Sequence, residues 1–113
     1  MITVKCLEDS KGCIRLTIRG HADSAPAGQD LVCAGVSALA YAAGEAVDRL
    51  AESGKLLDES VELTPGDAEI MALPVAEFRY EVWTVFWTVL CGLNVIARSF
   101  PECVADKSLR IAH

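Results

Sequence analysis

Residues 13–19 read CIRLTIR, and this stretch alternates apolar and polar side chains with a period of two. Its isoleucine and leucine side chains would lie on one face of a β-strand, and its arginine and threonine side chains on the other. Residues 1–7 alternate in a similar way, and the polar residues 8–12 between the two stretches are typical of a turn. The chain is therefore predicted to begin with a β-hairpin.

Two segments with helical spacing follow the hairpin. Apolar residues recur at steps of three and four between Asp30 and Glu52, which predicts a helix with Asp30 as its N-cap. Small residues are frequent in this segment, so the helix could pack closely against a sheet. A second helix is predicted to begin with Pro74 in its first turn and to end near Ser99.

The remaining segments complete an α+β pattern. Residues 61–63 and 68–73 predict two strands around a turn at 65–67, and residues 108–112 predict a short last strand. The order is then ββαββαβ. We expect one domain over residues 1–113, with a mainly antiparallel sheet of four to five strands and both helices packed on one face.

Composition limits the possible functions. The chain has 113 residues, 52% of them hydrophobic, which is enough for one core, and a net charge of -6. This charge argues against direct nucleic-acid binding, which needs clustered Lys and Arg. The charges at Lys5, Glu8 and Asp9 interrupt any apolar leader, and the five cysteines include no C-x-x-C pair. We therefore expect a cytoplasmic protein with reduced thiols, no metal site and no cofactor.

The second predicted helix is unusually apolar. Residues 82–97 carry no charge, but sixteen residues are fewer than the roughly 20 needed to span a bilayer. We expect a buried helix and no membrane association. Trp83, Phe86 and Trp87 belong to an apolar set that surrounds more than half of this helix, which predicts a homodimer formed through it.

His21 and Cys33 could form a nucleophilic site. Cys33 falls in the first turn of the predicted helix, where the helix dipole stabilises a thiolate and free N–H groups could hold an oxyanion. His21 follows the second strand, and the loop after it is long enough to bring the imidazole to the thiol. The histidine could then accept the thiol proton and later protonate a leaving amine. The residues alone also allow a small buried cysteine and an ordinary loop histidine.

The residues around this pair resemble a family signature. The triplet GHA at Gly20–Ala22, then Gly28, then DLVCAGVS at Asp30–Ser37, is similar to the signature of the ribosomal-processing cysteine protease family, Prp. The chain length and the predicted order of elements agree with that family.

The resemblance implies a bacterial protease with Cys33 as nucleophile and His21 as general base and acid. It implies removal of an N-terminal extension from large-subunit ribosomal protein number twenty-seven, with cleavage after an apolar, aromatic-containing segment and ahead of a basic stretch. It also implies a homodimer. The acidic charge of the chain would suit a basic substrate.

Other residues of the signature have two readings each. Asp30 could orient His21 or only cap the helix. Ser37 lies one turn after Cys33 and could hydrogen-bond in the site or pack between helix and sheet. Gly20 and Gly28 could be hinges of a substrate-binding loop that includes Ala22, or could only form turns.

Two other classes of function remain open from the sequence. A non-catalytic binding module that docks on ribosomal components would have a buried, unreactive Cys33 far from His21. A redox-sensing thiol protein would need a reactive Cys33 and a resolving cysteine, for which the sequence offers no obvious candidate. One histidine and one cysteine are too few ligands for a metal enzyme.

Overall fold

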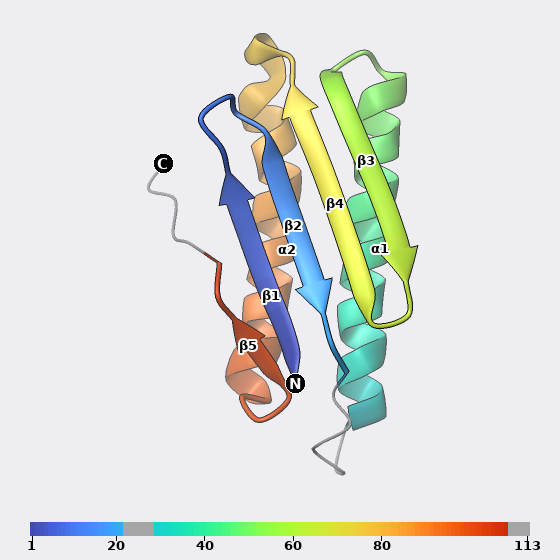
Figure 1. Ribbon diagram of the computed structural model, residues 1–113, viewed down its shortest axis with the longest axis vertical. Helices are drawn as coiled ribbons and strands as arrows, with labels where there is room; N and C mark the ends of the chain where they lie inside the picture. Colours follow the sequence, from blue (N-terminus) through green and yellow to red (C-terminus); the bar gives the residue numbers. More distant parts are fainter. Residues whose placement is uncertain (22–28, 109–113) are drawn as a thin grey trace.

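The computed structural model describes residues 1–21 and 29–108, and it consists of one sheet covered on one face by two helices (Figure 1). The elements are β1 (Ile2–Glu8), β2 (Ile14–Arg19), α1 (Gln29–Glu52), β3 (Leu56–Thr64), β4 (Asp67–Pro74), the 3-10 turn η1 (Ala76–Phe78), α2 (Arg79–Ser99) and β5 (Val104–Asp106). The predicted α+β class and the order ββαββαβ are confirmed.

The sheet is mixed, with strand order β3-β4-β2-β1-β5. The pairs β1–β2, β2–β4 and β3–β4 are antiparallel, and β5 lies parallel to β1. The edge strand β3 is nine residues long and has a bulge between Leu56 and Asp58. The other edge strand, β5, has only three residues.

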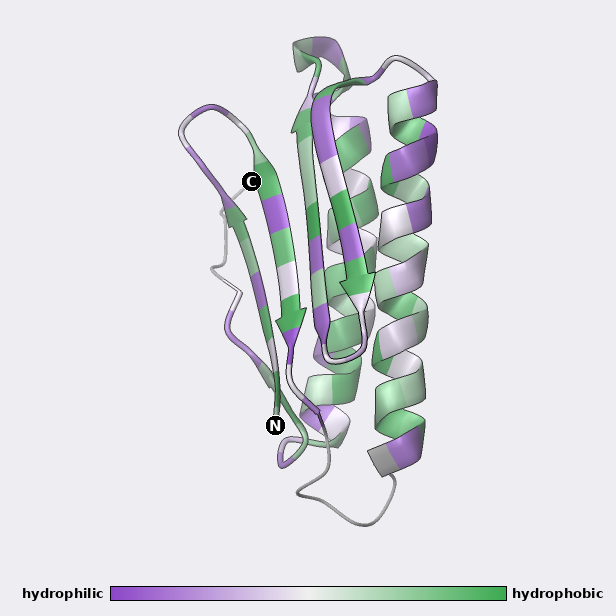
Figure 2. Ribbon diagram, turned by 45° about the vertical axis from the view of Figure 1, so that its right-hand side comes forward, coloured by the Kyte–Doolittle hydropathy of each residue, from purple (hydrophilic) through white to green (hydrophobic). Residues whose placement is uncertain are grey.

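The period-two pattern of the sequence places the core between the sheet and the helices. Ile14, Leu16 and Ile18 are buried as predicted, and their strand neighbours point to the open face of the sheet. This alternation is visible along β2 in Figure 2. From α2, Phe86 fills the core and is fully buried. The core is thus one apolar layer between sheet and helices.

Small residues in α1 allow the helix to approach β3 closely. A Cβ atom on Gly44 would lie 2.9 Å from Cγ1 of Val61 and 3.2 Å from Cδ1 of Leu63. Both distances are shorter than ordinary van der Waals contact, so α1 could not lie this close with a larger residue at position 44. The packing role predicted for the small residues is confirmed here.

The turn between β1 and β2 is held by Asp9. The carboxylate of Asp9 accepts hydrogen bonds from the backbone N–H groups of Cys13, at 3.0 Å, and Lys11, at 2.9 Å. These two bonds hold the pKa of Asp9 below its ordinary value of 3.8. The carboxylate thus stabilises the turn of the hairpin that the sequence predicts.

Two predicted boundaries are wrong. Pro74 ends β4 rather than opening the second helix, and α2 begins only at Arg79 after η1. A proline is tolerated at the end of a strand as well as in the first turn of a helix, so the residue itself did not decide between them. The last strand is β5, at Val104–Asp106; of the predicted strand 108–112, Ser108 lies outside any strand and the rest falls outside the described residues.

The predicted dimer contact on the second helix needs correction. Trp83 is only 5% exposed and Phe86 is 0% exposed, because both pack in the core of this chain. Their rings meet edge to face, with centroids 6.3 Å apart. Trp87 is 56% exposed, so it is the one member of the predicted set that lies on the surface.

Both helices leave apolar surface uncovered. Residues 30–52 and 76–99 are each long and apolar enough to cross a membrane by length and composition alone. Only 33% and 28% of their most apolar stretches are buried in this fold, although both helices pack against the sheet. Large apolar side chains are therefore exposed on both helices, such as Tyr41 on α1 and Trp87 on α2.

Candidate active site

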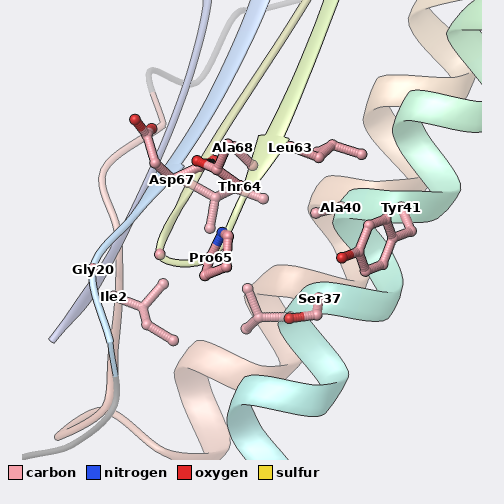
Figure 3. A pocket seen from close by; sticks show the side chains of 13 residues that line it. Ile2, Gly20, Ser37, Ala40, Tyr41, Leu63, Thr64, Pro65, Asp67 and Ala68 are labelled. Carbon is pink, nitrogen blue, oxygen red and sulfur yellow. Dashed lines mark hydrogen bonds between the residues drawn. The ribbon is translucent and has the colours of Figure 1, made fainter.

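A cleft opens at the end of the sheet where the β3–β4 turn faces α1 (Figure 3). It encloses about 480 Å³ including its open mouth. Its apolar side chains include Ile2 from β1 and Ile18 from β2. Ser37 and Tyr41 extend into it from α1, opposite Pro65 of the turn. An apolar floor with hydroxyl groups on the rim suits a peptide segment better than a small charged ligand.

His21 lies beside this cleft, directly after Gly20, which lines it. The backbone carbonyl of His21 accepts a hydrogen bond of 2.7 Å from the amino group of Met1. The side chain of His21 lies over Gly66, because a Cβ atom built on Gly66 would lie only 2.5 Å from Cε1 and would also overlap Nε2. The imidazole is therefore placed against the β3–β4 turn.

Gly20 joins the end of β2 to the same turn. Its N–H donates a hydrogen bond of 2.9 Å to the carbonyl of Gly66. Gly20 has a φ of 108°, and a Cβ atom there would overlap the carbonyl oxygen of Met1. Gly20 is thus required for a close backbone approach. The hinge role predicted for it stays a prediction.

Cys33 lies on α1 and is partly exposed, with its inner side against the core. Because α1 begins at Gln29, Cys33 is the fifth helical residue and lies in the second turn, not the first as predicted. The free N–H groups of a helix belong to its first turn, and the dipole effect falls off beyond it. The helix end is therefore a weaker source of thiolate stabilisation than predicted, and a neighbouring base becomes more important.

His21 and Cys33 each lie next to a residue that lines the cleft: His21 packs on Gly66, and Cys33 comes one helical turn before Ser37 on α1. Cys33, Ser37 and Tyr41 are spaced four residues apart and share one face of α1, and the last two line the cleft. Within residues 1–21 and 29–108, no hydrogen bond joins the imidazole to the thiol. Catalytic hydrogen bonds are often long in the absence of substrate and tighten when it binds.

The other predicted site residues are placed as follows. Asp30 is exposed in the first turn of α1, so it lies inside the helix and not at the N-cap, and no hydrogen bond joins it to the described His21. Ser37 is exposed and lines the cleft, which leaves it outside the helix–sheet contact. Ala22 and Gly28 fall outside the described residues.

The remaining cysteines differ from Cys33 in their surroundings. Cys6 and Cys103 are buried in the core. Burial, followed by the nearby charges of Asp106 and Glu8, raises the pKa of the Cys6 thiol to about 12. Burial also raises the pKa of Cys13. No cluster of three or more His, Cys, Asp or Glu side chains that could hold a metal ion occurs among the described residues.

The sequence reasoning missed the β3–β4 turn as part of the site. The tripeptide Pro65–Asp67 was interpreted only as a turn, although Gly66 contacts His21 and the turn lines the cleft. Tyr41 was also missed. Its position eight residues after Cys33 was the only available signal, because that spacing keeps a side chain on the same helix face.

Comparisons with known proteins identify the family of this chain. Residues 1–105 match the family described as cysteine protease Prp. The ribosomal processing cysteine protease Prp of Bacillus subtilis (strain 168) is 50% identical over 48 residues, which are 42% of this chain and 43% of that protein. The curated match thus spans less than half of the relative's length.

Two solved structures share the fold over most of their length. The essential ribosomal processing protease Prp from S. aureus, in complex with a covalently linked product peptide, has a TM-score of 0.73 and 25% identity, with 96% of this chain and 100% of that chain covered. SMU.848 from Streptococcus mutans has a TM-score of 0.69 and 26% identity, with 96% and 94% covered. By the match over residues 1–105, the chain belongs to the cysteine protease Prp family.

Proposed function

We propose that this chain is a cysteine endopeptidase that removes the N-terminal extension of large-subunit ribosomal protein number twenty-seven. The observation that carries the proposal is that His21 packs on Gly66 of the cleft lining, while the partly exposed Cys33 lies one helical turn before the lining residue Ser37. Membership of the Prp family supports the chemistry. The related S. aureus protease with its covalently linked product peptide supports a peptide as the substrate.

The proposed reaction uses both residues in two steps. His21 accepts the proton of the Cys33 thiol, and the thiolate attacks the carbonyl carbon of the scissile bond. The tetrahedral intermediate collapses when His21 returns the proton to the leaving amine, which leaves a thioester on Cys33. His21 then takes a proton from water, the hydroxide attacks the thioester, and the carboxylic product leaves as the thiol is restored. No cofactor takes part.

The cleft has features that suit a peptide with an apolar segment and a basic continuation. Its floor is apolar, and Ser37, Tyr41 and Thr64 supply hydroxyl groups at its rim. Asp67 adds a carboxylate beside the turn, which is paired with Arg19 at 3.0 Å. The net charge of -6 would draw a basic segment toward the protein.

Mass spectrometry of a peptide that spans the extension tests the proposal. We expect the wild type to cleave one bond, and Cys33→Ala and His21→Ala to leave the peptide intact. Cys91→Ala is the matched control, because Cys91 is an exposed cysteine on α2 away from the cleft lining, and it should cleave like the wild type. Cleavage that persists in Cys33→Ala would show that Cys33 is not the nucleophile.

The peptide experiment tests the binding-module alternative, and a separate oxidation experiment tests the redox alternative. A folded wild type that binds the peptide but leaves it intact would favour the non-catalytic binding module. That module was expected to bury Cys33, whereas the cysteine is partly exposed. A disulfide formed by Cys33 under mild oxidation would favour a redox-sensing thiol.

We also propose that the chain acts as a cytoplasmic homodimer through the outer face of α2. Tyr80, Trp87 and Val95 are large, exposed apolar residues on that helix. Five free cysteines support a reducing compartment. Light scattering at micromolar concentration should give the mass of two chains, and fractionation of cells should place the protein with the soluble cytoplasmic contents.

A further inference from the structure

The side chain of His21 lies on the β3–β4 turn where Gly66 has no side chain. The three heavy atoms nearest to a Cβ built on Gly66 are all imidazole atoms, namely Nε2, Cε1 and Cδ2, the last at 3.3 Å. The tip of the ring therefore occupies the space that any other residue at position 66 would need for its own side chain. Gly66 also has a φ of 75°, which side chains other than glycine rarely adopt.

This turn is tied to the end of β2 at two points next to His21. The N–H of Gly20 donates to the carbonyl of Gly66 at 2.9 Å. The Nε of Arg19 donates to Oδ1 of Asp67 at 3.0 Å. Within the turn, the hydroxyl of Thr64 donates to the carbonyl of Asp67 at 3.1 Å. The turn is thus held in a fixed place relative to the backbone that carries the imidazole.

The contact matters because little else holds the ring. His21 is exposed, and among the described residues no hydrogen bond to its side chain competes with the packing on Gly66. A general base must lie within hydrogen-bond reach of the proton it accepts. A displacement of about 1 Å can cost on the order of 10²-fold in rate.

We propose that Gly66 is a positioning residue for His21. The imidazole packs on the turn from Pro65 to Asp67, which we call its seat, in the space that a side chain at position 66 would otherwise fill. Any Cβ at this position displaces the ring from the turn, and with it the proposed general base. This role rests on the proposed protease function, since it concerns the placement of the general base.

Steady-state cleavage of the extension peptide by Gly66→Ala tests the proposal against a matched control. Gly54→Ala places alanine at a similar φ of 73°, with nothing within 4 Å of the added Cβ. Both variants carry the same kind of backbone strain and should show similar losses in melting temperature. We expect kcat to fall on the order of 10²-fold only in Gly66→Ala. The loss should appear in kcat more than in KM, because the displaced imidazole acts in the proton-transfer steps.

A spectroscopic measurement detects the seat without activity. In the wild type, NMR should show a nuclear Overhauser contact between Hε1 of His21 and Hα of Gly66. This contact should weaken in Gly66→Ala and persist in Gly54→Ala. If alanine at position 66 prevents folding, Gly66→Asn replaces it, because Asn tolerates a positive φ better than most residues and still carries a Cβ.

The outcomes distinguish this inference from the function on which it rests. A wild type that leaves the peptide intact would overturn the protease proposal and, with it, the role of Gly66. A wild type that cleaves, with Gly66→Ala as fast as Gly54→Ala, would overturn the role of Gly66 alone. A faster Gly66→Ala would also overturn it, because the seat would then hold His21 away from the thiol.

Discussion

Truncation of two neighbouring aromatic residues of α2 should lower the stability of the fold to very different extents. Phe86 is fully buried and Trp87 is mostly exposed. An aromatic side chain buries about 150–250 Å². At about 25 cal/mol per Å² that area corresponds to about 4–6 kcal/mol of transfer free energy. Alanine keeps the Cβ, so we expect Phe86→Ala to lower the free energy of unfolding by about 3–5 kcal/mol.

That loss is large against the total stability of a domain this size, which is about 5–15 kcal/mol. Trp87→Ala should lower the free energy of unfolding by about 1 kcal/mol or less when the chain is dilute enough to be monomeric. If α2 forms the dimer contact, the same variant should raise the dimer dissociation constant by about 30-fold, which corresponds to about 2 kcal/mol for a central aromatic residue.

Urea denaturation followed by circular dichroism measures the first effect, and sedimentation velocity over a dilution series measures the second. With an m-value of about 2 kcal/mol per M, Phe86→Ala should move the urea midpoint down by about 2 M. A Phe86→Ala variant that keeps wild-type stability but fails to dimerise would refute the reasoning. It would mean that Phe86 faces a partner chain and not the core.

Further predictions concern the cysteines, one turn and one helix contact. Iodoacetamide at pH 8 should label Cys91 in the native protein and leave Cys6 and Cys103 unlabelled until denaturation, because the two core thiols are shielded; peptide mass mapping measures this. The raised pKa of Cys6 also makes the free energy of unfolding depend on pH: its contribution is fully present below pH 9.0 and is lost as the pH rises through about 12. Asp9→Ala should lower the melting temperature at neutral pH. The difference in melting temperature from the wild type should vanish as the pH falls below the lowered pKa of Asp9, because the protonated carboxyl no longer stabilises the turn. A difference that stays constant across pH would contradict this. Gly44→Ala should cost about 1–3 kcal/mol of unfolding free energy in a urea titration, because the new Cβ overlaps β3, and a neutral effect would show that α1 can move outward freely.

Local sequence patterns predicted the strands and helices in which buried and exposed residues follow a regular period. The alternation around Leu16 and the helical spacing around Val36 each depend on residues within one strand or helix, so both were readable from the sequence. The position of β5 was not readable in the same way. Its three residues are ordered by pairing with β1, about a hundred residues earlier in the chain, and three residues are too few to show a period.

The orientation of α2 shows a second limit. Its apolar residues extend around more than half of the helix, so the hydrophobic pattern does not indicate which side faces the sheet. Glu8 helps to settle the orientation, because its carboxylate accepts hydrogen bonds from Arg79 at 3.1 Å and from Nε1 of Trp83 at 3.1 Å. This contact joins residues more than seventy positions apart and is invisible in the local pattern.

The sequence predicted which residues belong to the candidate site, but it did not predict the contacts between them. His21 and Cys33 were identified from a signature of known proteins, and whether they act as base and nucleophile stays a prediction. The contact between His21 and Gly66 depends on the β3–β4 turn reaching back to the end of β2. A proline–glycine turn gives no hint in the sequence of what will pack on it.

The two edges of the sheet also bear on how copies of this chain can meet. A free strand edge is a template for pairing with another chain, which leads to aggregation unless it is interrupted. Here β3 carries a bulge and the acidic residues Asp58, Glu59 and Glu62, and β5 offers only three residues. The bulge lies at one end of β3 and residues 58–64 keep a regular register, so it is the acidic side chains that disfavour pairing along that edge, while β5 is too short for a long ladder. The proposed dimer would therefore form through the helical layer and not through the sheet edges, and such a contact can stop at two copies.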